Sequence, residues 1–354
     1  MLVGETDDLS NYMRTKILST YVLGIALSLV FTVNRVVAQD FHFTQYDKSQ
    51  LTLNPALTGS FYGDWRLYNM YRSQWGGVLE EPFTTIGLGF QKPIYLENDK
   101  IAIGLFALND QVGDMGYQTN YVSLSASYHK IVGLSEISFG LQGAYTIRSI
   151  ADDIAFPEDF DRVTGTFVPD ASDMEVLNNT TSSHLDINLG VAWRGNFDNF
   201  KPSVGIAGYH INKPKEVFFA NSPSIETRIV SHLSFKTFVA DKFYVDPNFM
   251  LNNKAKVTSS IVGVNLGMEL GPNSASVEDI YAGLLIRNGV KGNQDAFILR
   301  AGTTFSNFII GASYDFNISE LKQGVASNGS FEFTLSYTAA STRLIKTKID
   351  YERL

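Results

Sequence analysis

Short runs in which apolar and polar residues alternate one by one recur along the chain from Trp65 onward. In one of them Val122, Leu124, Ala126 and Tyr128 share one face, and serines fill the positions between them. Successive side chains of a β-strand point to opposite faces, so each run predicts a strand with one apolar and one polar face. About fourteen runs have this pattern: 65–74, 83–91, 100–109, 119–130, 135–148, 184–195, 202–211, 227–239, 242–252, 257–270, 279–288, 294–305, 306–316 and 328–338.

The length and number of these runs favour a membrane barrel. A soluble β-sandwich also alternates, but its strands average about 5–6 residues and its apolar faces fill a shared core. Bacterial barrels have an even number of strands of about 9–11 residues or longer. Beyond the N-terminus, no apolar run reaches the ~20 residues of a membrane-spanning helix. The pattern therefore predicts an all-β protein, a transmembrane antiparallel β-barrel of about 14 strands over 65–338.

Aromatic residues are abundant, with 17 Tyr and 25 Phe, and many stand near strand ends, as in the girdles of membrane barrels. Trp65 and Trp75 are ten residues apart on one face of the first predicted strand, roughly 33 Å along the chain and about 24 Å in height once the strand tilts. This spacing is close to the apolar thickness of a membrane. The alternative is two unrelated surface tryptophans.

Charged residues of both signs fall on the face opposite the apolar rows, where they would point into the lumen. Ion pairs between them would brace a filled interior, which we favour over an open pore. The segment 39–64 lacks alternation and is rich in turn-forming residues, so we expect it to act as a plug in or under the barrel. The predicted lumen charges are Arg66, Arg72, Arg148, Asp186, Arg194, Lys236, Asp246, Glu269, Arg300, Asp315 and Glu332.

Both ends of the chain carry separate expectations. Residues 1–38 are predicted to be a signal peptide with its true start at Met13, because a basic stretch precedes an apolar one that ends at Ala38; the alternative is an uncleaved anchor helix. The chain has no cysteine, which excludes disulfides, thiolate metal sites and a lipidated cysteine. The basic tail 339–354 would lie in the periplasm and contact anionic lipid, unless it is a disordered tail.

The longest predicted connection, 149–183, falls on the extracellular side if the first strand runs outward from the periplasm, because bacterial barrels keep their long loops outside. This loop is acidic. We expect it to contact a partner; calcium is conceivable there, but no D-x-D-x-D-G spacing is present. The candidate contact residues are Asp152, Asp153, Glu158, Asp159 and Asp161.

No constellation of catalytic residues is readable. The five histidines lack a zinc spacing, the glycine pairs lie inside strand patterns, and no G-x-S-x-G or S-x-x-K element occurs. We therefore expect that the protein is not an enzyme and that it binds no cofactor and no metal. A formal net charge of −8 argues against nucleic acid as a partner.

Three motifs follow the predicted cleavage site in order: Q-D-x-x-F-x-Q-Y, L-N-P-A-x-x-G and Y-R-x-Q-W. Together with G-x-S-Y-D-x-N-x-S near the end, they resemble the PorP/SprF family of the type IX secretion system in Bacteroidetes, over about 39–338. Phe41 stands where many members of that family have proline. The motif residues are Gln39, Asp40, Phe43, Gln45, Tyr46, Leu53, Asn54, Pro55, Ala56, Gly59, Tyr71, Arg72, Gln74, Trp75, Tyr314 and Asp315.

The resemblance implies a non-enzymatic protein of the outer membrane that works in type IX secretion. Such a protein would accept a secreted adhesin through its C-terminal sorting domain, anchor it at the cell surface and support gliding motility. Its partners would be outer-membrane lipid, the adhesin, the type IX translocon and periplasmic ring components. The alternatives are an outer-membrane diffusion channel and a small-molecule or lipid transporter barrel.

Overall fold

The computed structural model describes residues 41–75, 81–97, 99–113, 116–150, 160–161, 166–167, 180–218, 224–255, 257–271, 277–289, 294–318 and 329–341. The expected signal peptide therefore lies outside the described residues, as do most of the loop 149–183 and most of the tail 339–354.

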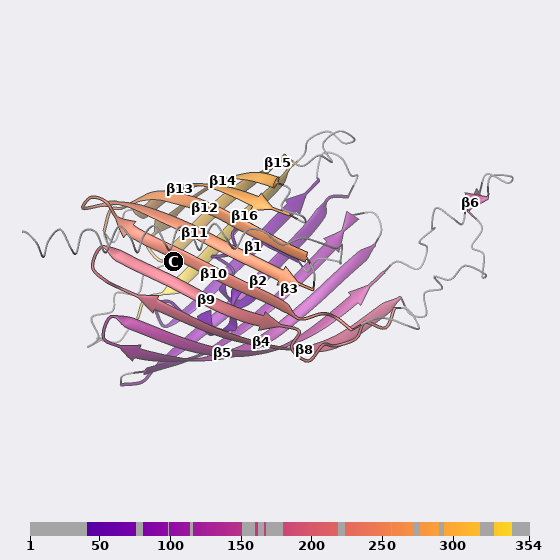
Figure 1. Ribbon diagram of the computed structural model, residues 1–354, viewed down its shortest axis with the longest axis horizontal. Coiled ribbons are helices and arrows are strands. Elements are labelled where there is room, and N and C mark those ends of the chain that lie inside the picture. Colours follow the sequence, from indigo (N-terminus) through magenta and orange to yellow (C-terminus); the bar gives the residue numbers. More distant parts are fainter. Residues whose placement is uncertain are drawn as a thin grey trace, which may run out of the picture.

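Fourteen antiparallel strands close into a barrel, which confirms the predicted fold (Figure 1). Around the barrel the order is β1-β16-β15-β14-β13-β12-β11-β10-β9-β8-β5-β4-β3-β2. Each predicted strand coincides with an observed one, and the boundaries shift by a few residues; β2, for example, ends at Tyr95 rather than at 91. The barrel strands are β1 (Trp65–Gln74), β2 (Phe83–Tyr95), β3 (Asp99–Val112), β4 (Tyr117–Val132), β5 (Ser135–Ser149), β8 (Thr181–Gly195), β9 (Phe200–Tyr209), β10 (Arg228–Phe238), β11 (Phe243–Lys254), β12 (Val257–Glu269), β13 (Val277–Asn288), β14 (Gln294–Phe305), β15 (Phe308–Asn317) and β16 (Ser330–Ala339).

The apolar rows face outward. On β4, Leu124 is 64% exposed, whereas Ser123 and Ser125 on the other face are 2% exposed. This distribution is the reverse of that in a soluble protein and is the one expected where lipid surrounds the wall. No helix among the described residues is long and apolar enough to cross a membrane.

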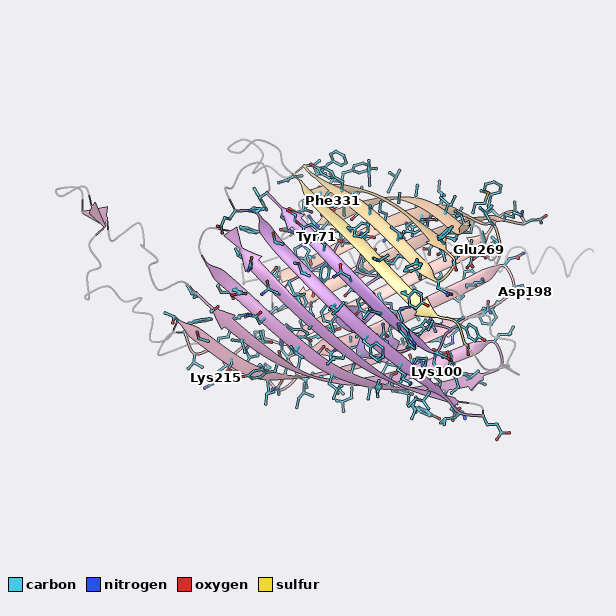
Figure 2. All side chains as sticks on the ribbon, turned by 180° about the vertical axis from the view of Figure 1, so that it is seen from behind. Tyr71, Lys100, Asp198, Lys215, Glu269 and Phe331 are labelled. Carbon is cyan, nitrogen blue, oxygen red and sulfur yellow. The ribbon has the colours of Figure 1, made fainter. Side chains whose placement is uncertain are left out.

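The two ends of the barrel differ in their connections. Brief turns join β2 to β3, β4 to β5, β8 to β9, β10 to β11 and β14 to β15 at one end, which we call the short-turn end. The opposite, long-loop end carries the connection from β5 to β8, with an unpredicted two-stranded ribbon of β6 (Phe160–Asp161) and β7 (Thr166–Phe167). Figure 2 shows Lys100, Asp198 and Glu269 near the short-turn end and Lys215 at the long-loop end.

Aromatic side chains contact one another near both ends of the wall. At the short-turn end Trp65 packs against Tyr337, with ring centroids 5.3 Å apart. Tyr314 and Phe316 pack at 4.7 Å near the long-loop end. Trp75 lies one residue beyond β1 and has a φ of 64°, so it follows the strand rather than continuing its outward face.

The buried core lies inside the barrel, between the wall and the segment 41–64, which we call the plug. The plug contains a short helix, α2 (Gln50–Leu53), and a 3-10 turn, η1 (Pro55–Leu57). Leu51, Ala56 and Phe61 of the plug are fully buried. This agrees with the predicted plug-like segment.

Candidate functional site

The plug crosses the lumen from the long-loop end to the short-turn end. Near its start, Phe41 packs edge-on against Tyr121, close to the long-loop end of β4. Near its end, the carbonyl of Gly63 accepts a hydrogen bond of 2.9 Å from the hydroxyl of Tyr95, the last residue of β2. The chain then turns directly into β1, so the plug fills the barrel along its axis.

A buried ionic cluster holds the first part of the plug. Arg72 pairs with Glu332 and, at 3.2 Å, with Asp315, and all three side chains are at most 2% exposed. The Glu332 carboxylate accepts hydrogen bonds from the backbone N–H groups of Thr44 and Gln45. The Thr44 hydroxyl accepts from Arg72 and donates to Asp315 at 2.8 Å. We call this arrangement the first clamp.

Arg287 on β13 joins the first clamp, although the alternation pattern gave no reason to place it in the lumen set. Its guanidinium is 2.7 Å from Asp315 and 3.0 Å from Asp295. Two arginines therefore share the Asp315 carboxylate. Buried charges are tolerated when they are paired and hydrogen-bonded in this way.

A second clamp holds the end of the plug. Glu136, 3% exposed, accepts from His129 at 2.8 Å and from Arg194 at 3.1 Å, and Lys100 lies 3.5 Å away. The same groups reach the plug backbone, because His129 bonds the carbonyl of Thr58 at 2.8 Å and Arg194 donates to that of Ser60 at 3.0 Å. Of these side chains only Arg194 was predicted. Lys100 and Glu136 stand at strand ends, where the alternation is short.

A third clamp lies on the opposite wall. Arg300 of β14 donates to Asp47 at 2.7 Å and to Asn265 at 2.7 Å. Burial raises the pKa of the Asp47 carboxyl, but Arg300 and Lys48 lower it more, so the net pKa lies below its ordinary value. Tyr46, next to Asp47, donates its hydroxyl proton to Asn248 at 3.0 Å.

The L-N-P-A motif contacts the wall closely at β8 and β9. The Asn54 side chain accepts from the N–H of Ala56 at 2.9 Å and so caps η1, which begins at Pro55. Its amide donates to the carbonyls of Val191 at 3.1 Å and Ile206 at 3.3 Å, on β8 and β9.

Glycines on β5 and β8 make room for this turn. A Cβ at Gly140 would overlap the backbone of Pro55 and Ala56, and a Cβ at Gly190 would overlap the Asn54 side chain. Gly140 and Gly190 are directly opposite partners in the ladder between β5 and β8. The L-N-P-A motif and the part of the wall that lacks side chains at Gly140 and Gly190 are therefore complementary in shape.

Other plug groups bond the wall individually. The N–H of Gly59, which has a φ of 67°, donates to Gln91 at 2.7 Å. The Gln142 amide donates to the carbonyl of Leu51 at 2.9 Å, and the Tyr209 hydroxyl donates to that of Thr52 at 2.8 Å. Polar groups on β2, β4, β5, β8, β9 and β16 thus bond the plug backbone, as buried backbone requires.

The remaining motif residues fall into two groups. Phe43, Gln45, Tyr46, Leu53 and Pro55 are buried with the rest of the plug, whereas Tyr71 and Tyr314 point outward. Gln74 is the last residue of β1. Gln39 and Asp40 lie outside the described residues.

The remaining predicted lumen charges do not form one site. Arg66 lies 4.2 Å over the ring of Phe61. Elsewhere Lys236 pairs with Glu269 at 2.8 Å, Asp186 with His210 at 2.6 Å, Arg148 with Glu216, and Asp246 accepts from Asn265 at 2.9 Å. Of the predicted loop residues, Asp152, Asp153, Glu158 and Asp159 lie outside the described residues, and only the backbone pairing of Asp161 is described.

Within the described ranges the lumen is closely occupied. The cavities between plug and wall include ones of about 140, 40 and 20 Å³. One water takes about 30 Å³ of liquid volume, so these spaces suit a few waters or a small solute. No group of three or more His, Asp or Glu side chains that could hold a metal ion occurs among these residues.

A closed barrel with an outward apolar wall and an internal plug defines an outer-membrane β-barrel. The family described as "Type IX secretion system membrane protein PorP/SprF" matches residues 36–337. The chain belongs to this family, which confirms the resemblance of its motifs. None of the curated proteins matches the chain.

Several solved outer-membrane barrels share the fold. The CymD monoaromatic hydrocarbon channel has a TM-score of 0.51 at 12% identity, covering 87% of this chain and 95% of its own. The TodX monoaromatic hydrocarbon channel deltaS2 mutant has a TM-score of 0.51 at 10% identity, covering 83% of this chain and 94% of its own. A FadL homologue of Pseudomonas aeruginosa has a TM-score of 0.50 at 9% identity, covering 82% of this chain and 94% of its own. At these identities the likeness shows the fold alone.

Proposed function

We propose that this barrel accepts a secreted adhesin with a C-terminal sorting domain and anchors it at the cell surface, in contact with the type IX translocon. Membership of the PorP/SprF family supports a role in this secretion system. The observation that carries the proposal further is the clamped plug, because a lumen braced by buried ion pairs suits a docking platform better than an open conduit.

The proposed orientation places the long-loop end outside the cell and the short-turn end in the periplasm. Bacterial barrels follow this rule of loop length. The acidic loop 149–183 would then face the adhesin, and the tail 339–354 would face the periplasmic ring components. Support of gliding motility would follow where the anchored adhesin is a motility adhesin.

A transporter barrel is the second candidate, and one observation favours it. An apolar groove of about 630 Å³ lies on the outer wall over β8 to β11, lined by Trp193, Val204, Ile206, Leu233 and Phe249 among others. Two of the similar structures are described as monoaromatic hydrocarbon channels. A groove of this kind would suit a small apolar molecule that arrives from the membrane.

Two measurements on the same preparation separate these functions. A tagged barrel, purified from native outer membranes in mild detergent, should bring down a large secreted protein or the translocon, identified by mass spectrometry. In planar bilayers it should show little conductance, whereas a variant that lacks residues 41–58 should conduct. Stable conductance of the intact barrel, together with a lone barrel in crosslinked preparations, would instead support a channel.

A further inference from the structure

One stretch of the wall is paired with a strand on only one side. β8 pairs with β5 along its whole length, from Thr181 to Gly195. Its pairing with β9 covers only the six residues Leu189 to Arg194. Toward the long-loop end, residues 181–188 of β8 have no strand partner on their second side among the described residues, and the chain segment 210–217 lies there instead.

β9 ends early because its backbone turns away. His210, the residue after β9, has a φ of 55°, and Lys213 has a φ of 45°. Non-glycine residues rarely adopt these left-handed values, and a strand cannot continue through them. The segment 210–217 therefore runs beside β8 without forming a regular ladder.

A side chain stands in for the missing strand. The Asn212 amide accepts from the N–H of Ile187 at 3.0 Å and donates to the carbonyl of Leu185 at 2.6 Å. The amide therefore satisfies one N–H and one C=O on the open side of β8, as the backbone of a neighbouring strand would. The Ile211 N–H donates to the carbonyl of Ile187 at 3.1 Å, and the Val217 N–H donates to the hydroxyl of Ser182 at 2.8 Å.

This cover is accessible, and it is held by its bonds to β8 and by the ion pairs of His210 with Asp186 and of Glu216 with Arg148. Asn212, Lys213 and Val217 are exposed, so a competing chain can reach them. A typical intramolecular hydrogen bond contributes about 0.5–1.5 kcal/mol net, and those of the Asn212 amide would be replaced rather than lost if another backbone took its place. Proteins commonly cover an open strand edge because it is a template for pairing with a second chain.

Resting on the proposed function, we propose that residues 181–188 of β8 are the docking edge for an extended strand of the secreted partner. The strand displaces the Asn212 amide and the segment 210–217, breaking the ion pairs of that segment with Asp186 and Arg148, and pairs with β8. The row of N–H and C=O groups selects the class of occupant, because a peptide backbone repeats such donor and acceptor pairs along the whole edge, whereas one side-chain amide supplies a single pair. Its side chains must alternate, with apolar ones beside the exposed Leu185 and Ile187 and polar ones beside the buried His184 and Asp186.

The chain has no cysteine, so a disulfide can lock the cover in place. Ser182→Cys with Val217→Cys joins the segment to β8 where their atoms already meet. Asn109→Cys with Asn120→Cys is the matched control, because these residues are direct partners on β3 and β4, joined by a side-chain bond of 2.9 Å. A gel shift on reduction shows that each disulfide has formed.

The first arm uses the purified full chain and a synthetic decapeptide of alternating Val and Thr with a photoreactive benzoylphenylalanine. Photolabelling of the fragment with residues 181–188 should rise several-fold in Asn212→Ala and fall at least fivefold in the oxidised lock, with recovery on reduction. Equal labelling in the locked and control proteins, or none on this fragment in Asn212→Ala, overturns the docking edge.

The second arm uses native outer membranes and asks which proteins co-purify. The secreted protein should accompany the control disulfide and be lost from the oxidised Ser182–Val217 lock. Its retention by both would refute the docking edge and leave the proposed function standing. Its absence from every preparation, wild type included, would refute the proposed function and the partner named here, while peptide labelling still decides whether the edge pairs with strands.

Discussion

Replacing Arg72 by methionine should weaken the first clamp without preventing barrel closure. Arg72 is 1% exposed and provides the cation that pairs with Glu332. Methionine keeps a side chain of similar length but leaves the Glu332 carboxylate with hydrogen bonds from Thr44 and Gln45. The Asp315 carboxylate loses one of its two cationic partners but keeps the other, because Arg287 stays 2.7 Å away.

Removing one partner of a buried ion pair destabilises a protein by about 3–5 kcal/mol. Because Asp315 keeps Arg287, we expect the lower end, about 3 kcal/mol, which is a change of roughly a hundredfold in the folding equilibrium. The ladder of fourteen strands remains, so the effect should concentrate on the plug.

Arg66→Met is the matched control, six residues earlier on the same strand. Arg66 is buried over Phe61 and donates to Thr338 at 2.9 Å, and it forms no ion pair with a carboxylate of the described residues. We expect about 1 kcal/mol for the loss of a hydrogen bond there.

Guanidinium unfolding of both variants in detergent, followed by tryptophan fluorescence, gives the free energies from the midpoints at a common slope. Limited proteolysis between residues 41 and 64 reports on the plug directly. If Arg72→Met lost no more stability than Arg66→Met and its plug resisted the protease equally, the clamp would not be the restraint argued here.

Two further predictions follow from the plug contacts. Gly140→Val should displace Pro55 and Ala56 and destabilise the protein by about 1–3 kcal/mol, measured by the same unfolding assay. Gly143→Val should be nearly neutral, because a Cβ there meets nothing within 4 Å. Equal losses of stability in the two variants would refute the shape complementarity between the L-N-P-A turn and the wall. The pKa of Asp47 is lowered in the folded protein, so its contribution is fully present above the unfolded value of about 3.9 and is lost as pH falls through the folded value. The unfolding midpoints of wild type and Asp47→Asn should therefore differ at pH 7, begin to converge below about pH 4 and meet only below the lowered folded value, and a constant difference would contradict the pairing with Arg300.

Part of the plug could also be predicted from the sequence. Its turn-forming residues and lack of alternation separate 39–64 from the strands, and Arg72, Asp315 and Glu332 fall on polar faces. Nothing local could show that these three side chains, from β1, β15 and β16, meet around Thr44. Lys100, Glu136 and Arg287 escaped prediction because alternation is too short at strand ends to assign a face.

By itself the sequence determined the architecture, because period-two alternation over strands of about ten or more residues has few stable solutions other than a barrel in lipid. It also determined the family, through motifs in fixed order. Only the tertiary structure decided which charges pair and how the L-N-P-A motif packs against Gly140 and Gly190. It also decided where the Asn212 amide bonds the side of β8 that has no strand partner. Those contacts join residues far apart in the chain, and closure of the barrel brings them together.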